Sequence, residues 1–490
     1  MPILRAAQAV TTEILLKYCS IFSLILPMQH KISFQTLSFL FCFLILGIVG
    51  NIAGNTAFAQ KKKKTTPAKQ GGKTETAIVI SAEAQPPIKI GMCFVDSDPL
   101  DLPQVRAAQM AVAEVNASGG VMGRKLALII ASSPNRVYNN FYIALKSVID
   151  SGVTCVIIPD GSDLVIKSAN YTVVKDVLMM ATSSTSPDIS LLKDNDLVWR
   201  TSASDVFQGQ VVADLLDSMK LKTAAVIYVD NNYGNGLFTN FKNDFEKLGG
   251  TLTNAVKYAP MQSYREIDFK KQLDTVFSQK PKAVYVISDI EDGIKITMQS
   301  QIYGFLTKDY KPQLVGCDAN YSNDFLLAVN PSILEGMIGL SYVRPKNNPT
   351  HEKFLTRFKQ FLKENKDSSN YAASVLDGLV DTETIDTYAS TSYDAVYVLA
   401  LAMAKANSFV SGDIAKNIRT IANAAPQTET VTPTDFAKSA ATLLKGKRIN
   451  YNGASSAIEF DDKGDVSSGS YTVWRVNKGR YSVTRTVSFP

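Results

Sequence analysis

A chain of 490 residues can form two or three domains, and 46% hydrophobic with 20% charged residues is an ordinary globular composition. The net charge of +6 lies entirely in residues 1–85, because the remainder holds 42 basic and 42 acidic residues. A neutral body gives no overall field that attracts nucleic acid. Two histidines also leave almost nothing for a Ser-His-Asp triad or a His-rich zinc site. Composition therefore argues against nucleic-acid-binding proteins, zinc sites and hydrolases.

The N-terminus shows the features of a secretory signal in their usual order. Lys31 lies in a short basic region, residues 37–49 form an apolar run, and Ala57-Phe58-Ala59 is a small-x-small cleavage site before Gln60. The apolar run is short for a membrane span and the cleavage motif follows it. Removal of the signal is therefore favoured over a retained membrane anchor, and we predict an exported protein.

The residues around this signal are interpreted as a leader and a linker. Residues 1–27 would be an unusually long extension ahead of the signal, so translation is predicted to start at Met28, within a leader that spans residues 1–59. Residues 60–87 are rich in Lys, Thr, Gly, Ala and Pro and have no apolar periodicity. This composition predicts a disordered linker between the leader and the folded body.

From Ile88 onward, strand and helix patterns alternate along the chain. Strands are predicted at 88–94, 125–130, 153–158 and 178–181, and helices at 104–116, 138–150 and 164–175. After Thr201, strands are predicted at 224–229, 251–257, 283–287 and 313–315, and helices at 207–220, 237–248, 269–277 and 294–303. The last third adds helices at 352–363, 393–406 and 413–422 and strands at 471–476 and 481–487. This alternation indicates an α/β fold with two parallel sheets, and thus two lobes with a cleft between their strand ends.

A run of hydroxyl residues stands out at the end of one predicted strand. Thr182 to Ser186, here called the hydroxyl loop, follows the apolar strand at 178–181 and ends at Pro187. Its hydroxyls compete with the strand ladder for backbone hydrogen bonds, so the chain is expected to leave the sheet there. Ligands in open α/β sheets bind at such carboxyl ends. A polar surface loop that caps the next segment is the alternative interpretation.

Five short segments carry a recognisable pattern: IKIG at 88–91, AEVNASGGVMGR at 113–124, YGNG at 233–236, SYDAVY at 392–397 and FDDKGDV at 460–466. In this order they resemble the type I periplasmic binding proteins, and within them the leucine/isoleucine/valine-binding group of ABC importers. The resemblance covers residues 88–476. It implies two lobes, each an open and mostly parallel sheet with helices on both faces, joined by three crossovers.

The resemblance also implies where the chain passes between the lobes. The three crossings of the family would fall near Thr201, near residues 339–342 and near Gly453. The implied boundaries are 88–203 and 342–452 for lobe 1, and 204–341 and 453–490 for lobe 2.

The function implied by the resemblance is solute capture without catalysis. Such a protein binds an amino acid or a small amide in the cleft and delivers it to the permease subunits of an ABC importer. We therefore expect a periplasmic monomer with an amino-acid-like small-molecule ligand, and neither a cofactor, a metal, a nucleic-acid partner nor enzymatic activity. A type I-fold envelope protein that regulates a cell-wall enzyme or sensor by protein contact is the alternative, which a filled or narrow cleft would favour. A Rossmann enzyme is disfavoured because residues 94–99 offer no glycine for a pyrophosphate.

The resemblance implies that the family's ligand-binding positions fall at seven residues of this chain: Ser162, Ser183, Ser184, Thr185, Tyr233, Asp289 and Asp318. Asp289 is a departure, because the family has a tyrosine there. The first loop, residues 94–103, also departs from the family, since it is acidic where the family has Gly, Ser and Thr. The resemblance therefore leaves the identity of the ligand open.

Hydroxyls and free amides at helix N-termini suit a ligand carboxylate, because they donate hydrogen bonds without a buried counter-charge. Ser162 and the hydroxyl loop would take that role, Asp318 would bind the ammonium, and Tyr233 would cover the apolar part of the ligand. The alternatives are a helix N-cap for Ser162, a cap of the helix at Phe325 for Asp318, and packing for Tyr233. Asp289 would pair with a cationic group of the ligand or lie in a solvated loop.

Three cysteines remain after cleavage of the signal: Cys93, Cys155 and Cys317. The first two fall on strands that would be neighbours in a sheet of order 2-1-3-4-5. Buried free thiols are expected, and a disulfide between Cys93 and Cys155 in an oxidising compartment is the open alternative.

Overall fold

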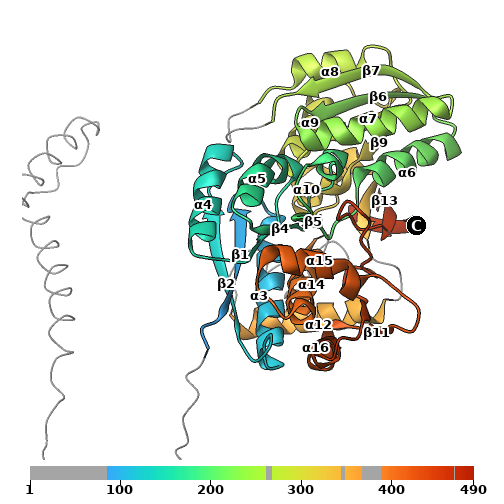
Figure 1. Cartoon of the computed structure of the whole chain (residues 1–490). Coiled ribbons are helices and arrows are strands. Elements are labelled where there is room, and N and C mark those ends of the chain that lie inside the picture. Colours follow the sequence, from blue (N-terminus) through green and yellow to red (C-terminus); the bar gives the residue numbers. More distant parts are fainter. Residues whose placement is uncertain (1–84, 261–266, 344–347, 367–387, 468, 490) are drawn as a thin grey trace, which may run out of the picture. The chain divides into compact units, whose positions relative to one another are not determined.

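The computed structural model describes residues 85–260, 267–343, 348–366, 388–467 and 469–489. The predicted leader and nearly all of the predicted linker lie outside the described residues, so both stay predictions. The described residues belong to one compact unit, Ala82–Pro490, which holds two large sheets with helices around them (Figure 1).

The first sheet, which defines lobe 1, has five parallel strands in the order β2-β1-β3-β4-β5. The strands are β1 (Ile88–Val95), β2 (Leu126–Ser133), β3 (Cys155–Ile158), β4 (Leu178–Ala181) and β5 (Val198–Arg200). The helices are α3 (Asp101–Ala117), α4 (Tyr138–Asp150), α5 (Ser162–Val174), α12 (Pro349–Glu364), α14 (Ala389–Ala406), α15 (Ser411–Ala422) and α16 (Phe436–Leu444). A small parallel pair, β11 (Glu429–Val431) and β12 (Ile449–Tyr451), lies beside α15 and α16.

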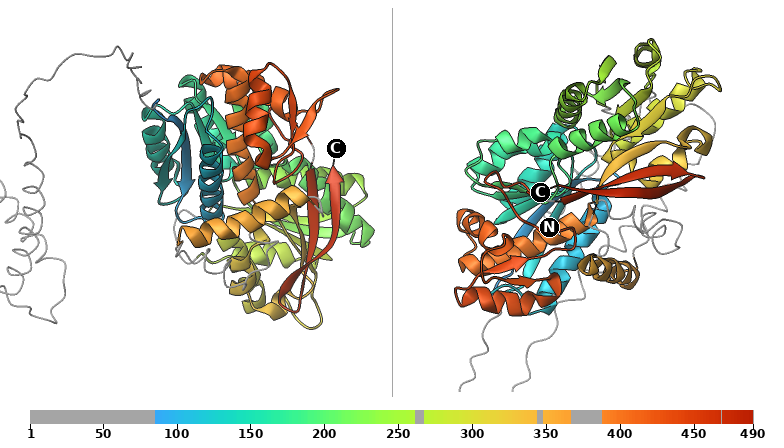
Figure 2. Two further views of the ribbon diagram at one scale, coloured as in Figure 1. Left: turned by 90° about the horizontal axis from the view of Figure 1, so that it is seen from below. Right: turned by 90° about the vertical axis from the view of Figure 1, so that its right-hand side faces the viewer.

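Apolar side chains cover both faces of this sheet, as its continuous hydrophobic strands require. Ile90 and Met92 of β1 pack in a core with α3 and α14, whereas Val95 packs in a second core with α4 and α5. Gly91 lets α4 come close to β1, because a Cβ there would lie 2.4 Å from Cγ1 of Val148. The two views in Figure 2 show α3 and α14 together on one side of the lobe 1 sheet.

The packing of helices on both faces of the sheet determines where the cysteine side chains lie. Cys155 belongs to the core with α3 and α14, whereas Cys93 belongs to the core with α4 and α5. The two side chains therefore lie on opposite faces of the sheet, although β1 and β3 are neighbours. Cys93, Cys155 and Cys317 are all buried free thiols, as predicted, and the alternative disulfide is not formed.

The second sheet, which defines lobe 2, has the order β14-β13-β10-β9-β8-β6-β7. The strands are β6 (Thr223–Val229), β7 (Thr251–Tyr258), β8 (Ala283–Ile287), β9 (Gln313–Gly316), β10 (Ile338–Val343), β13 (Gly469–Asn477) and β14 (Arg480–Phe489). Only β13 and β14 run antiparallel to their neighbours. The helices are α6 (Asp205–Ser218), α7 (Asn232–Lys247), α8 (Lys270–Phe277), α9 (Ile290–Ile302), α10 (Asn323–Ala328) and α11 (Pro331–Leu334). The α/β fold with mostly parallel sheets flanked by helices is therefore confirmed.

Buried polar groups hold the segment that follows β12 against lobe 1. Asp394 of α14 accepts hydrogen bonds from the amides of Ala454 and Ser455, at 2.8 and 2.7 Å. Further along, the fully buried Arg200 forms a bidentate ion pair with Asp465, at 2.7 and 2.8 Å. Because of these contacts, Phe460 and its neighbours lie in the lobe 1 core. The chain thus stays in lobe 1 beyond the predicted crossing near Gly453 and enters the second sheet at β13.

Among the described residues, no single helix combines the length and apolarity needed to cross a membrane. Only α14 and α15 together meet that test of length and composition, and they are bent by 105° relative to each other. Nearly every residue of α14 is buried in the lobe 1 core.

Candidate ligand-binding cleft

A cavity of about 280 Å³ lies between the two lobes. From lobe 1 it is lined by residues 97–100, 135–138, 160–164 and 167. From lobe 2 it is lined by residues 231, 233, 260, 289–292 and 319. Nearly all of these follow the carboxyl end of a strand, namely β1, β2 and β3 in lobe 1 and β6, β7, β8 and β9 in lobe 2. This is the edge at which open α/β sheets bind ligands, so we take this cleft as the candidate site.

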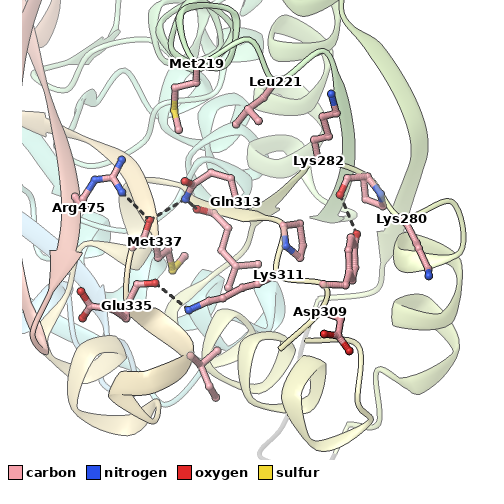
Figure 3. A pocket seen from close by; sticks show the side chains of 16 residues that line it. Met219, Leu221, Lys280, Lys282, Asp309, Lys311, Gln313, Glu335, Met337 and Arg475 are labelled. Atoms are coloured by element: carbon pink, nitrogen blue, oxygen red, sulfur yellow. Dashed lines mark hydrogen bonds between the residues drawn. The ribbon is translucent and has the colours of Figure 1, made fainter. Parts of the chain in front are cut away.

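A second and larger cavity, about 660 Å³, lies in lobe 2 alone (Figure 3). Its lining residues precede β6, β8, β9 and β10, so it opens at the amino ends of the parallel strands. The side chains of Lys311, Gln313 and Arg475 in it donate to backbone carbonyls of residues 332–336 and 314. Its position at the amino edge of one sheet makes it the weaker candidate.

Arg136 lies at the centre of the interlobe cleft. Its guanidinium forms ion pairs with Asp98 and with Asp160, the latter at 3.4 Å, both in lobe 1. It also forms an ion pair at 2.6 Å with Asp289 in lobe 2. The five N–H donors of a guanidinium form a rigid fork, which lets one side chain serve several carboxylates. Arg136 therefore joins the two lobes across the cleft.

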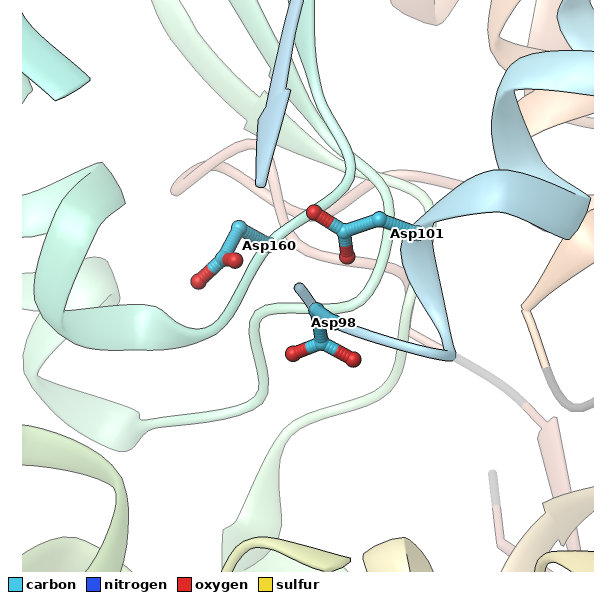
Figure 4. A group of neighbouring side chains, drawn as sticks. All are labelled: Asp98, Asp101 and Asp160. Atoms are coloured by element: carbon cyan, nitrogen blue, oxygen red, sulfur yellow. The ribbon is translucent and has the colours of Figure 1, made fainter. Parts of the chain in front are cut away.

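Three aspartates gather on the lobe 1 side of Arg136: Asp98, Asp101 and Asp160 (Figure 4). Carboxylate oxygens of the three lie within 4.8 Å of one another. Burial raises the pKa of Asp160 to about 6, even though the nearby Arg136 lowers it. Burial, and then the charges of Asp160 and Asp98, raise the pKa of Asp101 well above its usual range. Such a spacing could hold a cation, and here the Arg136 guanidinium already contacts two of the three carboxylates.

Asp292 in the first turn of α9 is the buried acid on the lobe 2 side of the cleft. Asp292 is one of the residues that line the cavity, it is 1% exposed, and neither carboxylate oxygen has a hydrogen-bond partner among the described residues. Burial, followed by the charge of Asp289, raises the pKa of Asp292 to about 7. The Tyr258 hydroxyl, which lowers this pKa, likewise makes no hydrogen bond of normal geometry. Asp292 is thus a buried acid that lies near the Tyr258 hydroxyl and accepts no hydrogen bond of normal geometry from the described residues.

The predicted hydroxyl residues lie together beside the cleft and bond to the protein itself. Oγ of Ser183 donates to the Pro159 carbonyl at 2.9 Å, and Oγ of Ser184 donates to the Asp160 carbonyl at 2.6 Å. Ser162 lines the cleft, and its Oγ accepts from the amide of Thr185 at 3.1 Å.

The Ser162 hydroxyl therefore ties the hydroxyl loop to the start of α5. The N-cap position of α5 is Gly161, so the alternative of a helix cap at Ser162 is wrong. The hydroxyl of Thr185 donates to Oδ2 of Asp205 at 2.8 Å, which connects the loop to the first residue of α6 in lobe 2.

Asp318 and Tyr233, two of the predicted ligand-binding residues, contact each other in lobe 2. The Tyr233 hydroxyl donates to Oδ1 of Asp318 at 2.6 Å, and the Tyr388 hydroxyl donates to Oδ2 at 2.6 Å. Nε2 of Gln208 also donates to Oδ1, at 3.1 Å. Ser322 caps α10, the helix that contains Phe325, so the capping alternative for Asp318 is wrong. Tyr233 is both a packing residue of the lobe 2 core and a lining residue of the cleft.

Arg136 and Asp292 were not predicted from the sequence, although a signal for both exists. Arg136 follows β2 in the sequence SSPNR at 132–136, and Asp292 follows β8 in SDIED at 288–292. The first segment begins at the end of the half-buried strand β2 and the second follows the buried strand β8; both are mostly polar, like the hydroxyl loop after β4. Asp289, which was predicted, is 31% exposed and pairs with Arg136.

The two-lobed α/β architecture, with a cleft at the carboxyl ends of both sheets, is that of the type I periplasmic binding proteins. The family described as "Receptor family ligand binding region" matches residues 104–479, and the chain belongs to this family.

Known proteins of three kinds are similar to this chain. Glutamate receptor 3.1 of Oryza sativa subsp. japonica is 23% identical over 79% of this chain, which spans only 40% of that relative's length. Leu/Ile/Val-binding protein homolog 2 of Brucella abortus is 27% identical over 63% of this chain and 80% of its own length. The solved structure of a leucine-binding protein, LivK, from Thermotoga maritima matches 82% of this chain and 98% of its own, with a TM-score of 0.63 at 21% identity. This structural likeness supports the fold.

Proposed function

We propose that the chain is the substrate-binding protein of an ABC importer, which captures an amino acid, branched-chain or related, or a small amide between its lobes. The observation that carries this proposal is the cavity lined by the carboxyl-end loops of both sheets. The Brucella relative's name as a Leu/Ile/Val-binding protein and the leucine-binding protein of similar fold support it.

Capture in such a cleft rests on contacts from both lobes. Arg136 and Asp289 bridge the cleft, and Nδ2 of Asn232 donates to Oδ1 of Asp163 across it at 3.0 Å. A ligand that contacts both lobes adds interactions that exist only when the two lobes are closed around it. It therefore shifts the population toward closure by as much as its affinity for the two states differs.

In the proposed binding mode, Ser162 donates its hydroxyl proton to the ligand carboxylate, and the hydroxyls of Ser183, Ser184 and Thr185 turn from their present acceptors to donate to it as well. Asp318 binds the ammonium, Asp289 pairs with a cationic group and Tyr233 covers the apolar part. Asp318 is buried and is not among the residues that line the cavity, but its carboxylate has accepting capacity left for this role. A carboxylate has about four lone-pair sites, and three donors already contact Asp318. One further donor can therefore bind without displacing the tyrosines.

The proposal extends to the cellular setting of the protein. We infer export through the predicted signal peptide, a mature chain in the periplasm that acts as a monomer without catalysis, and membrane permease subunits as partners. The alternative function, regulation of a cell-wall enzyme or sensor by protein contact, was expected to have a filled or narrow cleft. A cavity of about 280 Å³ between the lobes favours solute capture, because it is close to the lower end of the range of small-molecule sites, about 300–1,000 Å³.

Mass spectrometry of the solute that stays bound during purification from native envelopes tests the proposal. A single small solute, either an amino acid or a small amide, that is released on unfolding and rebinds with saturation in calorimetry is the expected result. A protein that carries no solute and instead co-purifies in stable stoichiometry with a cell-wall enzyme would contradict it.

A further inference from the structure

The lining of the interlobe cleft has more carboxylates than cations. Its described lining residues include six acids, Asp98, Asp160, Asp163, Asp289, Glu291 and Asp292, and two bases, Arg136 and Lys167. Lys167 already pairs with Asp163 at 2.6 Å, where both side chains are partly exposed. Among the described lining residues, Arg136 is therefore the one cation left for the remaining carboxylates, which come from both lobes, although Lys295 lies near Glu291 from outside the lining.

The contacts of Arg136 show which chemistry this lining accepts. Its guanidinium pairs with Asp98 and Asp160 from the loops after β1 and β3, and with Asp289 from the loop after β8. A planar cation is thus bound by carboxylates that converge from two lobes. A ligand carboxylate in the same place would have no cationic partner among the described lining residues, because Arg136 and Lys167 are both already paired.

Asp292 is an independent observation that points the same way. Both of its oxygens lack a hydrogen-bond partner although the residue is 1% exposed and lines the cavity. Buried carboxylates are ordinarily paired or hydrogen-bonded, since burial without a partner is unfavourable. A ligand that brings an N–H donor and a positive charge to this point would supply both missing interactions.

We propose that the ligand of the interlobe cleft is a small organic cation, whose ammonium or guanidinium group pairs with the unpartnered carboxylate of Asp292. This inference rests on the proposed function and narrows its ligand class to cationic amino acids and small amines or guanidines. Asp289 lies three residues before Asp292, at the N-cap position of α9, and adds a second carboxylate on the same side of the cleft. Arg136 keeps its ion pairs with the lobe 1 carboxylates. The acidic lining therefore binds two cations, Arg136 and the cationic group of the ligand.

A metal ion explains the lining less well. In the cluster of Asp98, Asp101 and Asp160, the Arg136 guanidinium already contacts two of the carboxylates. Oδ2 of Asp101 accepts from the Val95 amide at 2.8 Å. Asp292 does not belong to that cluster, so a metal ion there would leave its carboxylate unpaired.

Calorimetric titration of the mature protein with matched probes tests the inference. The probes are L-arginine with its neutral isostere L-citrulline, L-lysine with L-norleucine, and L-leucine. We expect each cationic member to bind at least about tenfold more tightly than its neutral partner, which corresponds to about 1.4 kcal/mol. This comparison needs no variant, so it decides the question even where a substitution disturbs folding.

Asp292→Asn assigns the effect to the proposed residue. Removing one partner of a desolvated charge pair should lower the affinity for L-arginine by about 30-fold or more and leave L-citrulline nearly unchanged. The control is Asp274→Asn, the same chemical change on α8 of lobe 2 at a half-exposed site paired with Lys270. It should change either affinity by less than about fivefold.

The outcomes separate the inference from the proposed function. Saturable binding of L-leucine or L-citrulline with equal or weaker binding of L-arginine and L-lysine would overturn the cationic ligand and leave amino-acid capture intact. An unchanged preference for L-arginine in Asp292→Asn would overturn the role of Asp292. Binding of no probe would also overturn the inference, and the solute recovered by mass spectrometry would then decide the function.

Discussion

Replacing Asp292 by Asn should stabilise the ligand-free protein above neutral pH and change little in acid. Burial, and then the charge of Asp289, raises the pKa of Asp292 from its ordinary value of 3.8 to about 7. Between these values the folded protein holds a proton that the unfolded chain has released. The free energy of unfolding of the wild type therefore falls as the pH rises from about 4 to about 7.

The size of this change in the free energy of unfolding follows from the shift in the pKa of Asp292. A difference of about three pKa units, at about 1.4 kcal/mol per unit, gives up to about 4 kcal/mol. Asn has nearly the same shape and carries no charge, so the free energy of unfolding of Asp292→Asn should equal that of the wild type near pH 4. Near pH 8, the free energy of unfolding of the variant should be higher than that of the wild type by up to about 4 kcal/mol.

Urea unfolding of both proteins near pH 4 and near pH 8 measures the difference. Trp474 is fully buried in lobe 2, so its fluorescence in a Trp199→Phe background reports on the lobe that contains Asp292. Asp274→Asn is again the control, with an expected change below about 1 kcal/mol at either pH. An equal increase in the free energy of unfolding of Asp292→Asn at both pH values would refute the reasoning, because it would show that the buried charge is not the cause of the increase.

Three further predictions concern binding and export. Asp318→Asn should weaken ligand binding by about 2–5 kcal/mol if this carboxylate holds the ligand ammonium, as measured by calorimetry; equal dissociation constants would remove Asp318 from the site. Small-angle scattering should show a smaller radius of gyration on saturation with ligand, since the ligand adds contacts between the lobes; an unchanged radius would argue against a closing cleft. N-terminal sequencing of protein from the native envelope should begin at Gln60, and a mature chain that retains residues 37–49 would contradict the predicted cleavage.

Much of the alternation of strands and helices could be predicted from the sequence, because many of the parallel strands are short apolar runs. β4 and β8, for example, are buried at every position. One strand that was not predicted is β5, which has three residues and ends at Arg200. A buried arginine is stable there only because Asp465, far along the chain, pairs with it. No local pattern in the sequence shows such a pair.

The candidate site could be predicted in part. The resemblance named Asp318 and Tyr233 as ligand-binding residues, and in the structure a hydrogen bond joins them; their role in binding stays a prediction. The acidic first loop and Asp289 were noted as departures, but their common partner Arg136 was not found. It comes from another loop of lobe 1, and its contacts depend on how the two lobes meet. Contacts between lobes are set by tertiary structure, so the spacing of residues along the chain does not reveal them.

The buried thiols make this protein suitable for site-specific labelling. Burial raises the pKa of Cys155 and of Cys317 to about 12, whereas an exposed cysteine has a pKa near 8.5. Because the thiolate is the reactive form, an exposed cysteine should react on the order of a thousandfold faster at neutral pH. Lys146→Cys on α4 and Lys247→Cys on α7 would place one dye on each lobe at exposed positions. Energy transfer between the dyes would then follow the opening and closing of single molecules without removal of any native cysteine of the described residues.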